Sequence, residues 1–324
     1  MKKVLLTILV IVVLVIVVLA SYVKFGLPNV GAAPDLHVSI TPERVHHGEY
    51  LANHVSLCMD CHSTRDWSKY SGPMIPGTNG KGGELFDEKL GFPGIFYSKN
   101  ITPANIKDWT DGEIFRTITT GEDKFGNALF PVMPYHYYGK MDKEDIYDII
   151  AYIRSLAPIE NKVPDRKIDF PMNFIVNTIP TKASLVVKPS KSDTIQYGAY
   201  LVNAAACMEC HTQVKKGQVI PELAFSGGRD FHMPNGVVNS ANITPDKATG
   251  IGGWTAEQFV ARFKAYTDPV NIPEMAPNQV NTIMPWAMLG GMDTSDLRSI
   301  YSYLRTLKPI NHEVIHFVAV KDEK

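Results

Sequence analysis

Two Cys-x-x-Cys-His motifs are the residues of this sequence with the clearest chemistry. One covers residues 58–62 (Cys-Met-Asp-Cys-His), the other covers residues 207–211 (Cys-Met-Glu-Cys-His), and together they contain every cysteine of the chain. Two thiols at this spacing reach the two vinyl groups of one porphyrin, and the following histidine becomes the proximal iron ligand. The motifs therefore predict two covalently bound haem c groups. The predicted attachment residues and proximal ligands are Cys58, Cys61, His62, Cys207, Cys210 and His211.

Two other kinds of site use paired cysteines. A single Cys-x-x-Cys pair can be a thiol redox centre, and two pairs can hold a structural zinc ion. Four-cysteine zinc ligation does not explain the histidine that follows each pair, and Cys58 and Cys207 are 149 residues apart. Haem attachment is therefore the preferred interpretation.

Each iron needs a second axial ligand, and the predicted ones are Met133 and Met284. They follow His62 and His211 by 71 and 73 residues, and each precedes a proline and an aromatic residue. Proline fixes the backbone and removes an amide donor, which helps a loop present the sulfur atom. A thioether ligand raises the reduction potential of the iron.

Several residues compete for this second position. Met141 and Met292 also recur in register, but they precede the final helices and are expected to fill the core. Met59 and Met208 lie inside the attachment loops, where they cannot reach the far face of the haem. His136 is a further candidate for the first iron, although the second copy has no histidine there.

Each motif belongs to one copy of a module that occurs twice in the sequence. Five blocks recur in the same order, with a period too long for a solenoid repeat. Paired in order, they are residues 48–51 with 198–201, 58–62 with 207–211, 100–103 with 242–245, 132–135 with 283–286, and 151–156 with 302–307. The sequence therefore predicts two modules, at residues 43–158 and 193–311, joined by a connector over residues 159–192.

Each module is expected to be mainly α-helical. A first helix should precede each cysteine pair, with Gly48 and Gly198 allowing it to cross the last helix closely. Middle helices should begin at Thr110 and Thr255, which fit the capping-box pattern. The last helices should follow two aspartates and carry apolar residues at helical spacing. These residues are Asp142, Ile146, Ile149, Ile150 and Ile153, and Asp293, Leu297, Ile300, Tyr301 and Leu304.

Weaker signals accompany these elements. Asn100 and Asn242 are expected either to orient a haem propionate or to form an Asx turn. Tyr152 and Tyr303 should pack the last helix on the first. Arg65, Arg229, Trp109 and Trp254 are candidates to bind propionates.

The N-terminus predicts a membrane anchor over residues 1–23. An uncharged run extends from Val4 to Val23, long enough for the ~30 Å hydrocarbon core, and follows Lys2 and Lys3. Those lysines should remain cytoplasmic, which places the rest of the chain outside. A cleaved signal peptide is the alternative, although its apolar region is usually shorter.

Three irregular segments complete the predicted organisation. Residues 24–42 should be a linker, because they mix glycine and proline with few periodic apolar positions. The connector at residues 159–192 should pack along the modules through Phe170, Phe174, Ile175 and Ile179. Residues 312–324 form a C-terminal tail. The net charge of −1 gives no basic field for nucleic acid.

Over residues 43–310 the chain resembles the membrane-bound cytochrome c subunits of periplasmic alcohol and sugar-acid dehydrogenases. The marks are the two haem motifs, residues 242–246 followed by 249–255, and Met284-Pro285 before a final helix that ends Tyr-Leu-Arg. The resemblance implies two tandem class I cytochrome c domains with Met133 and Met284 as axial ligands. The chain differs from those subunits in two respects. Many of them carry three haems, whereas this chain has two haem motifs, and its first module lacks the Thr-Gly-Ile-Gly stretch.

The resemblance implies electron transfer from a dehydrogenase towards a quinone or an oxidase. We accordingly expect a dihaem cytochrome of the respiratory chain, held on the periplasmic side of the cytoplasmic membrane. Its partner would be a dehydrogenase, a quinol-oxidising complex or a terminal oxidase, and the chain alone should lack catalytic activity. The alternative is a dihaem enzyme such as a peroxidase or thiosulfate dehydrogenase, which requires a vacant or labile iron position. A structural or sensory haem protein in a larger complex is the third possibility.

Overall fold

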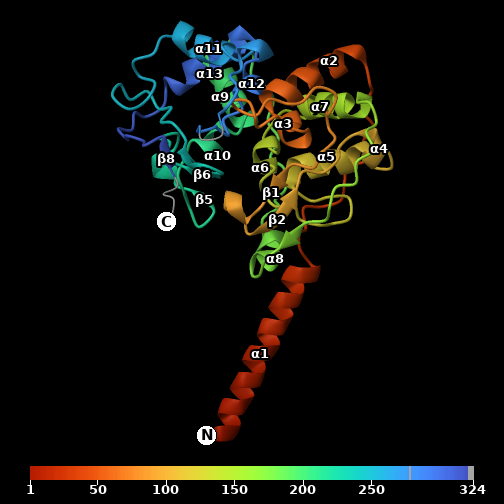
Figure 1. Cartoon of the computed structure of the whole chain (residues 1–324). Helices are drawn as coiled ribbons and strands as arrows, with labels where there is room; N and C mark the ends of the chain where they lie inside the picture. Colours follow the sequence, from red (N-terminus) through yellow and green to blue (C-terminus); the bar gives the residue numbers. More distant parts are fainter. Residues whose placement is uncertain (277–278, 320–324) are drawn as a thin grey trace.

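The first helix, α1 (Lys2–Phe25), projects away from the rest of the molecule in the computed structural model, which describes residues 1–276 and 279–319 (Figure 1). None of its residues is buried by the rest of the chain. It is long and apolar enough to cross a membrane. This agrees with the anchor predicted from the uncharged N-terminal run.

Two similar sets of elements follow α1, and 41% of the chain is helical. The first set is α2 (Pro42–Tyr50), η1 (Leu51–Val55), α3 (Cys58–His62), β1 (Leu85–Phe86), η2 (Glu88–Leu90), β2 (Gly94–Tyr97), α4 (Pro103–Ile106), α5 (Asp111–Thr120), α6 (Tyr135–Tyr138) and α7 (Lys143–Ser155). The second set is α9 (Thr194–Ala204), α10 (Cys207–Cys210), β4 (Val214–Lys215), β5 (Gln218–Val219), η4 (Pro221–Leu223), β6 (Asp230–Met233), β7 (Gly236–Asn239), α11 (Ala256–Lys264), η5 (Pro269–Asn271), α12 (Trp286–Leu289), α13 (Thr294–Leu304) and β8 (Phe317–Ala319). Between them lie β3 (Lys167–Ile168), α8 (Met172–Ile175) and η3 (Val176–Thr178).

The first and last helices of each set cross at a glycine. A Cβ atom on Gly48 would lie 1.8 Å from the Asp148 carbonyl oxygen, and one on Gly198 would lie 1.9 Å from that of Ser299. Glycine is therefore required at both crossings, as the sequence predicted. The apolar faces of α7 and α13 lie in the core, where Ile146, Ile149, Ile150, Leu297 and Leu304 are at most 2% exposed.

The predicted helix starts are present. Thr110 and Glu113 form a complete capping box at α5, and Thr255 and Gln258 form another at α11. Each pair satisfies two amide groups that a helix end would otherwise leave without partners. These caps fix the middle helices against α7 and α13, behind the attachment motifs.

Short strands are more numerous than the sequence indicated. Within residues 1–276 and 279–319, three small antiparallel sheets have the orders β1-β2-β3, β4-β5 and β6-β7-β8. Each strand has two to four residues, too few for an alternating apolar pattern to stand out. Residues 312–319 of the expected tail contribute β8, which pairs with β7, and residues 320–324 lie outside the described part of the chain.

The segment after the anchor is not a free tether. The amide of Val38 donates to the Asp111 carboxylate at 2.8 Å, and the Pro34 carbonyl fills the space where Gly112 lacks a side chain. Val38 is only 4% exposed. The linker therefore lies along α5, an outcome that its low apolar periodicity did not reveal.

The connector packs mainly through its backbone, not through all the apolar residues expected to do so. Strand β3 pairs with β2, and the Ser184 amide donates to the Gly139 carbonyl. Phe170 is 80% exposed and Ile175 is 44% exposed. For these two residues the predicted packing on the modules is wrong, because their side chains are exposed.

Two tyrosines hold the halves together through reciprocal hydrogen bonds. The Tyr50 hydroxyl in α2 donates to the Asp296 carboxylate at 2.8 Å and accepts from the Asp293 amide at 3.1 Å. Burial raises the pKa of Tyr50, so the hydroxyl remains a donor. Asp296 is fully buried and also contacts Lys191 of the connector, at 3.4 Å.

The opposite pair of helices repeats this arrangement. The Tyr200 hydroxyl in α9 donates to Asp145 at 2.5 Å and accepts from the Asp142 amide at 3.1 Å. Lys188 of the connector neutralises Asp145 at 2.5 Å. Tyr50 and Tyr200, like the two aspartate pairs, occupy matching positions in the sequence repeat, so the two halves meet with approximate two-fold symmetry.

Replacing Tyr200 by phenylalanine is expected to destabilise the chain by about 1–3 kcal/mol, because buried Asp145 loses a donor. Tyr50→Phe should have a similar effect through Asp296. Chemical unfolding measures both changes. Tyr147→Phe is the matched control, since the Tyr147 hydroxyl has no hydrogen bond within the described residues. Equal midpoints for all three variants would contradict this role of the interface.

Candidate functional site

The first Cys-x-x-Cys-His motif begins with a left-handed turn. Leu57 has φ 56°, and the short helix α3 then carries the motif. Nδ1 of His62 lies 2.7 Å from the Lys99 carbonyl oxygen, and the His62 carbonyl accepts from the Gly82 amide at 2.8 Å. A carbonyl can only accept, so Nδ1 is the protonated nitrogen and Nε2 is free to bind a metal.

The second motif has the same construction. Ala206 has φ 50°, and α10 follows with its two cysteines. Nδ1 of His211 lies 2.8 Å from the Ala241 carbonyl oxygen, and the His211 carbonyl accepts from the Gly227 amide at 2.8 Å. Desolvation lowers the pKa of both motif histidines. Each is therefore a neutral imidazole with a fixed tautomer, the form that ligates iron.

The four thiols do not resemble a thiol redox centre. Desolvation raises the pKa of Cys58, Cys61 and Cys207 to about 12, and that of Cys210 to about 11. Redox-active Cys-x-x-Cys pairs have lowered thiol pKa values. No disulfide links the four residues. The thiols are suited to a covalent attachment that removes their ionisation altogether.

Zinc ligation also fails on geometry. Across residues 1–276 and 279–319, the one group of three His, Cys, Asp or Glu side chains close enough to share an ion is His47, Asp145 and Asp148. Neither cysteine pair belongs to it. Arg44 and Lys188 already pair with these carboxylates, at 2.6 and 2.5 Å, so this group is an ion-pair network.

Met133 and Met284 lie in loops of matching geometry. The prolines that follow them have φ and ψ of −80° and 52° at Pro134, and −82° and 62° at Pro285. In both loops the methionine carbonyl accepts from the amide two residues later, at 2.8 Å. Both side chains are partly buried and pack against the same core as Cys58 and Cys207.

The rival residues are engaged elsewhere. Met141 and Met292 are fully buried, as is Met59. The Met141 sulfur accepts from the Ser56 hydroxyl at 3.7 Å. His136 lies 3.6 Å from Glu209 of the second half. The three methionines therefore lie in the core, and His136 joins the two halves.

The two asparagines form Asx turns. The Asn100 side chain accepts from the Thr102 amide at 2.9 Å and donates to the Ile159 carbonyl at 2.8 Å. Asn242 makes the same pair of bonds, with Thr244 at 3.0 Å and Ile310 at 2.8 Å. Both ends of each amide are therefore occupied by backbone groups. This tying of the loop to the chain after the last helix favours the Asx-turn interpretation over a propionate contact.

Two arginines pair with the acidic residue inside each attachment motif. Arg65 lies 3.1 Å from Asp60, and Arg229 lies 2.6 Å from Glu209. Although desolvation raises the pKa of Glu209, hydrogen bonds from His136 and Arg229 lower it to about 2. At Asp60 desolvation prevails over Arg65, and the pKa is raised.

These ion pairs were not predicted from the sequence. The acidic residue at the third position of the motif recurs and was a usable signal, but its arginine partner lies at a different distance along the chain in each half. Arg65 follows its motif by three residues, whereas Arg229 follows by 18. The pairs rigidify both attachment loops, and they engage the two arginines that the sequence had suggested for propionates.

Trp109 and Trp254, suggested for the same role, contribute backbone carbonyls to helix packing. The Trp109 carbonyl accepts from the Arg154 guanidinium, and the Trp254 carbonyl accepts from the Tyr301 hydroxyl at 2.5 Å. Both donors lie at the repeated last helix. Neither contact bears on a propionate.

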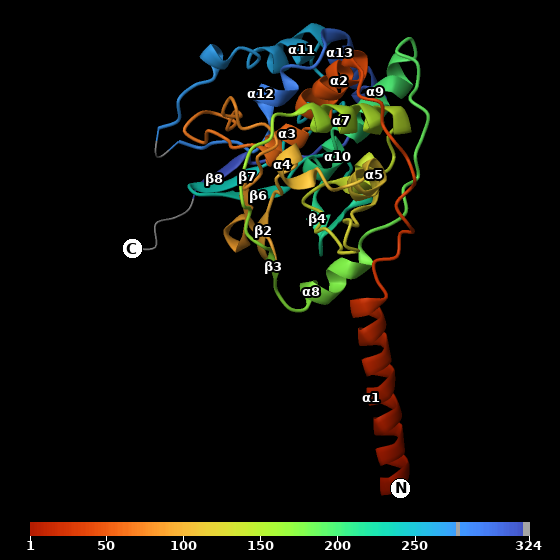
Figure 2. The ribbon, with the colours of Figure 1, turned by 90° about the vertical axis from the view of Figure 1, so that its right-hand side faces the viewer.

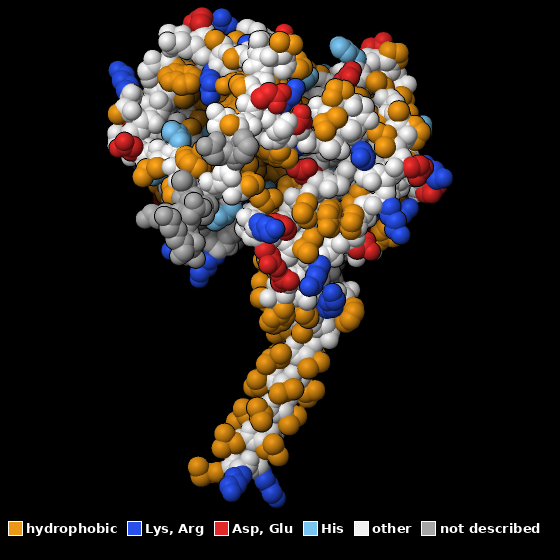
Figure 3. All heavy atoms as spheres, in the orientation of Figure 1, with side chains coloured by type: hydrophobic (Ala, Val, Ile, Leu, Met, Phe, Trp, Pro, Cys, Tyr) orange, Lys and Arg blue, Asp and Glu red, His pale blue; other side chains and the backbone are white. Residues whose placement is uncertain are grey.

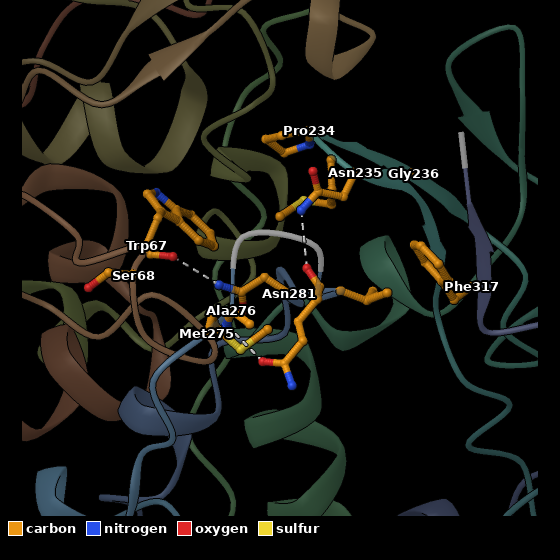
Figure 4. Close-up of a pocket in the computed structure, with 12 residues that line it drawn as sticks. Trp67, Ser68, Pro234, Asn235, Gly236, Met275, Ala276, Asn281 and Phe317 are labelled. Atoms are coloured by element: carbon orange, nitrogen blue, oxygen red, sulfur yellow. Dashed lines mark hydrogen bonds between the residues drawn. The ribbon is translucent and has the colours of Figure 1, made fainter. Parts of the chain in front are cut away.

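A cavity of about 260 Å³ lies where a loop of the first half meets the second half (Figure 4). Trp67 and Met275 line one side, and Phe317 and the β6–β7 turn line the other. Asn281 donates to the Trp67 carbonyl at 3.3 Å and bridges the two halves. The described lining residues carry no charge, so the cavity offers apolar contact and a few amide groups.

Comparison with known proteins agrees with this geometry. Residues 195–308 match the model of the cytochrome c family. The cytochrome c subunit of a quinone alcohol dehydrogenase from Gluconobacter oxydans (strain 621H) is 25% identical over 234 residues, which is 67% of this chain and 46% of the relative. The fructose dehydrogenase cytochrome subunit of Gluconobacter japonicus is 28% identical over 253 residues, or 73% of this chain and 48% of the relative.

A shorter relative covers more of its own length. A dihaem c-type cytochrome of Cereibacter sphaeroides is 25% identical over 264 residues, which is 78% of this chain and 82% of the relative. By contrast, the chain spans about half the length of the dehydrogenase subunits. A cytochrome c domain implies covalently bound haem c, and the residues present fit that group, because both motif histidines have Nε2 free and are held by a backbone carbonyl at Nδ1. The chain therefore contains a cytochrome c domain and is homologous to the cytochrome c subunits of quinone alcohol dehydrogenase and fructose dehydrogenase.

Proposed function

We propose that this protein is a membrane-anchored dihaem cytochrome c that transfers electrons between a periplasmic or membrane redox partner and a respiratory acceptor. The observation that carries the proposal is the repeated construction of the two motifs. Each has a left-handed residue before the first cysteine, a histidine held at Nδ1 and a methionine followed by proline in the same conformation.

The roles of the residues follow from this construction. Cys58 and Cys61 would attach the first haem, and His62 would bind its iron. Cys207, Cys210 and His211 would do the same for the second haem. With Met133 and Met284 as the second ligands, the proposed haem-binding residues are Cys58, Cys61, His62, Met133, Cys207, Cys210, His211 and Met284.

With two protein ligands, neither iron would offer a position for a substrate. Haem c supplies a one-electron iron couple, and the chain supplies ligands, burial and orientation. Met133 and Met284 would be the second ligands of the two irons, which would favour electron transfer over turnover of a small molecule. The close reciprocal packing of the halves suits transfer between the two groups.

The proposed organisation follows the sequence repeat. Two class I cytochrome c domains would cover residues 43–158 and 193–311, with the connector at 159–192 and β8 extending the second domain. Helix α1 would be the anchor, with Lys2 and Lys3 on the cytoplasmic side and the domains on the periplasmic side. The relatives are named as subunits of dehydrogenases, so a dehydrogenase is the proposed electron donor, with a quinone-linked complex or oxidase beyond it.

Stopped-flow mixing of the reduced full chain with ferricyanide tests this function. We expect two electrons to leave each chain, and we expect no catalytic consumption of hydrogen peroxide or thiosulfate. A variant with Cys207→Ala and Cys210→Ala should deliver one electron and serves as the stoichiometric control. Sustained turnover of peroxide or thiosulfate by the chain alone would contradict the proposal and favour a dihaem enzyme.

A further inference from the structure

We propose that the turn formed by α8 and η3 is a second membrane contact, with Phe170 and Ile175 inserted into the headgroup layer beside α1. The inference rests on the proposed anchor and adds a surface of the connector that touches lipid. The anchor alone would let the globular part swing about one point. A second contact would fix its orientation on the membrane.

The first step is the position of this turn. The Asn177 side chain donates to the Val23 carbonyl at 3.1 Å, and the Lys24 ammonium lies 5.9 Å from the centre of the Phe174 ring. Both contacts join the turn to the last residues of α1. In the two perpendicular views, α8 lies next to the upper end of α1, on the side of the globular part that faces the anchor (Figures 1 and 2).

The length of α1 sets the depth of this turn relative to the membrane. Helix α1 has 24 residues and is therefore about 36 Å long, which exceeds the ~30 Å hydrocarbon core. If Lys2 and Lys3 lie at one surface, the last turn of α1 emerges in the opposite headgroup layer. Tyr22 and Lys24 are residue types favoured there. Because Asn177 bonds to Val23, the turn lies at the same level.

Apolar side chains of the turn and of the end of α1 are exposed. Phe170 is 80% exposed and Ile175 is 44% exposed, beside Tyr22 at 57% and Phe25 at 85%. Val176, in the same turn, is only 2% exposed. The exposed apolar surface of α1 thus continues onto the connector. Figure 3 shows hydrophobic side chains along α1, with both basic and acidic side chains near its junction with the globular part.

A bilayer is the occupant that fits these observations. The patch formed by Phe170 and Ile175 adjoins α1, whose own surface would face lipid. Lys24, beside Phe174, can meet lipid phosphate. Aromatic residues with neighbouring lysines at this depth are typical of interfacial contacts. A protein partner or a second copy would instead leave the patch in water when the chain is alone in a membrane.

The test uses the full chain, reconstituted in phosphatidylcholine vesicles, with one added cysteine carrying the fluorophore NBD. Phe170→Cys and Ile175→Cys probe the patch, and Leu14→Cys probes the anchor. Val270→Cys is the matched control, since Val270 is 88% exposed and belongs to η5 of the second half. The unsubstituted chain should take up no label, because its four thiols are expected in thioether bonds. An unchanged haem absorption spectrum shows that each variant is folded.

We expect NBD at positions 170 and 175 to emit at shorter wavelengths and to be quenched by aqueous iodide severalfold less than at position 270. Lipid-borne quenchers near the headgroup should act more strongly on it than quenchers deep in the acyl region. Iodide quenching equal to that at position 270, with position 14 protected, would overturn the second contact while leaving the anchor intact. Loss of protection at position 14 would overturn both. Labelling of the unsubstituted chain would instead count against haem attachment.

Discussion

Replacing Met284 by alanine is expected to open the second haem site and to convert its iron from low-spin to high-spin. Met133→Ala should do the same at the first site. The sulfur atoms sit in loops fixed by the following prolines, and no other residue in the described part of the chain repeats that construction at both sites. Optical and EPR spectra of the oxidised chain measure the change.

Histidine at either position should keep the iron low-spin but lower its potential. Axial ligands span a range of ~0.8 V, and loss of the thioether moves the iron towards its lower part. Met292→Leu and Met141→Leu are the matched controls, because both side chains are fully buried in the core. A control variant that loses the sulfur signature, with Met284→Ala unchanged, would reassign the ligand.

Gly198→Ala is expected to destabilise the chain by about 3 kcal/mol or more. The added methyl group would lie 1.9 Å from the Ser299 carbonyl oxygen and 3.0 Å from Cβ of Tyr303, so α9 and α13 must separate. Gly48→Ala should act similarly on α2 and α7, where the Asp148 carbonyl is 1.8 Å away. Denaturant unfolding followed by the haem absorption measures the loss.

The control for these substitutions is Gly253→Ala. A Cβ atom there meets no other atom within 4 Å, and the backbone needs no positive φ. Its unfolding midpoint should remain that of the parent chain. If Gly198→Ala were equally harmless, the close helix crossing would not be a source of stability.

Much of the helical framework was predictable because it depends on interactions between residues close together in the sequence. The apolar spacing of α7 and α13 and the capping boxes at Thr110 and Thr255 are local signals, and the structure bears them out. The repeat itself pointed to the glycine crossings. These features can be predicted without knowing which distant residues they contact in the folded chain.

The rest depends on contacts between distant residues. Strands as short as β3 are made by their partner and not by their own sequence, so the three small sheets were missed. Residues 24–42 were predicted only as a linker because they have few periodic apolar positions, yet Asp111 binds the Val38 amide. The Arg–acid pairs at the two motifs were hidden because their spacing differs between the halves.

Phe170 illustrates a different limit. Its apolar character predicted packing on a module, because the sequence alone gives no second place for such a side chain to go. The structure leaves it 80% exposed, in the segment that we propose touches lipid. Phenylalanine is suited both to a protein core and to lipid, so only its position in the structure distinguishes the two environments.

An optical and EPR redox titration of the purified full chain tests the central claim most directly. Two low-spin iron centres, both with histidine and methionine ligands and together accepting two electrons per chain, are the predicted result. A colourless chain, a single haem, or one iron that is high-spin without a sulfur signature would contradict it.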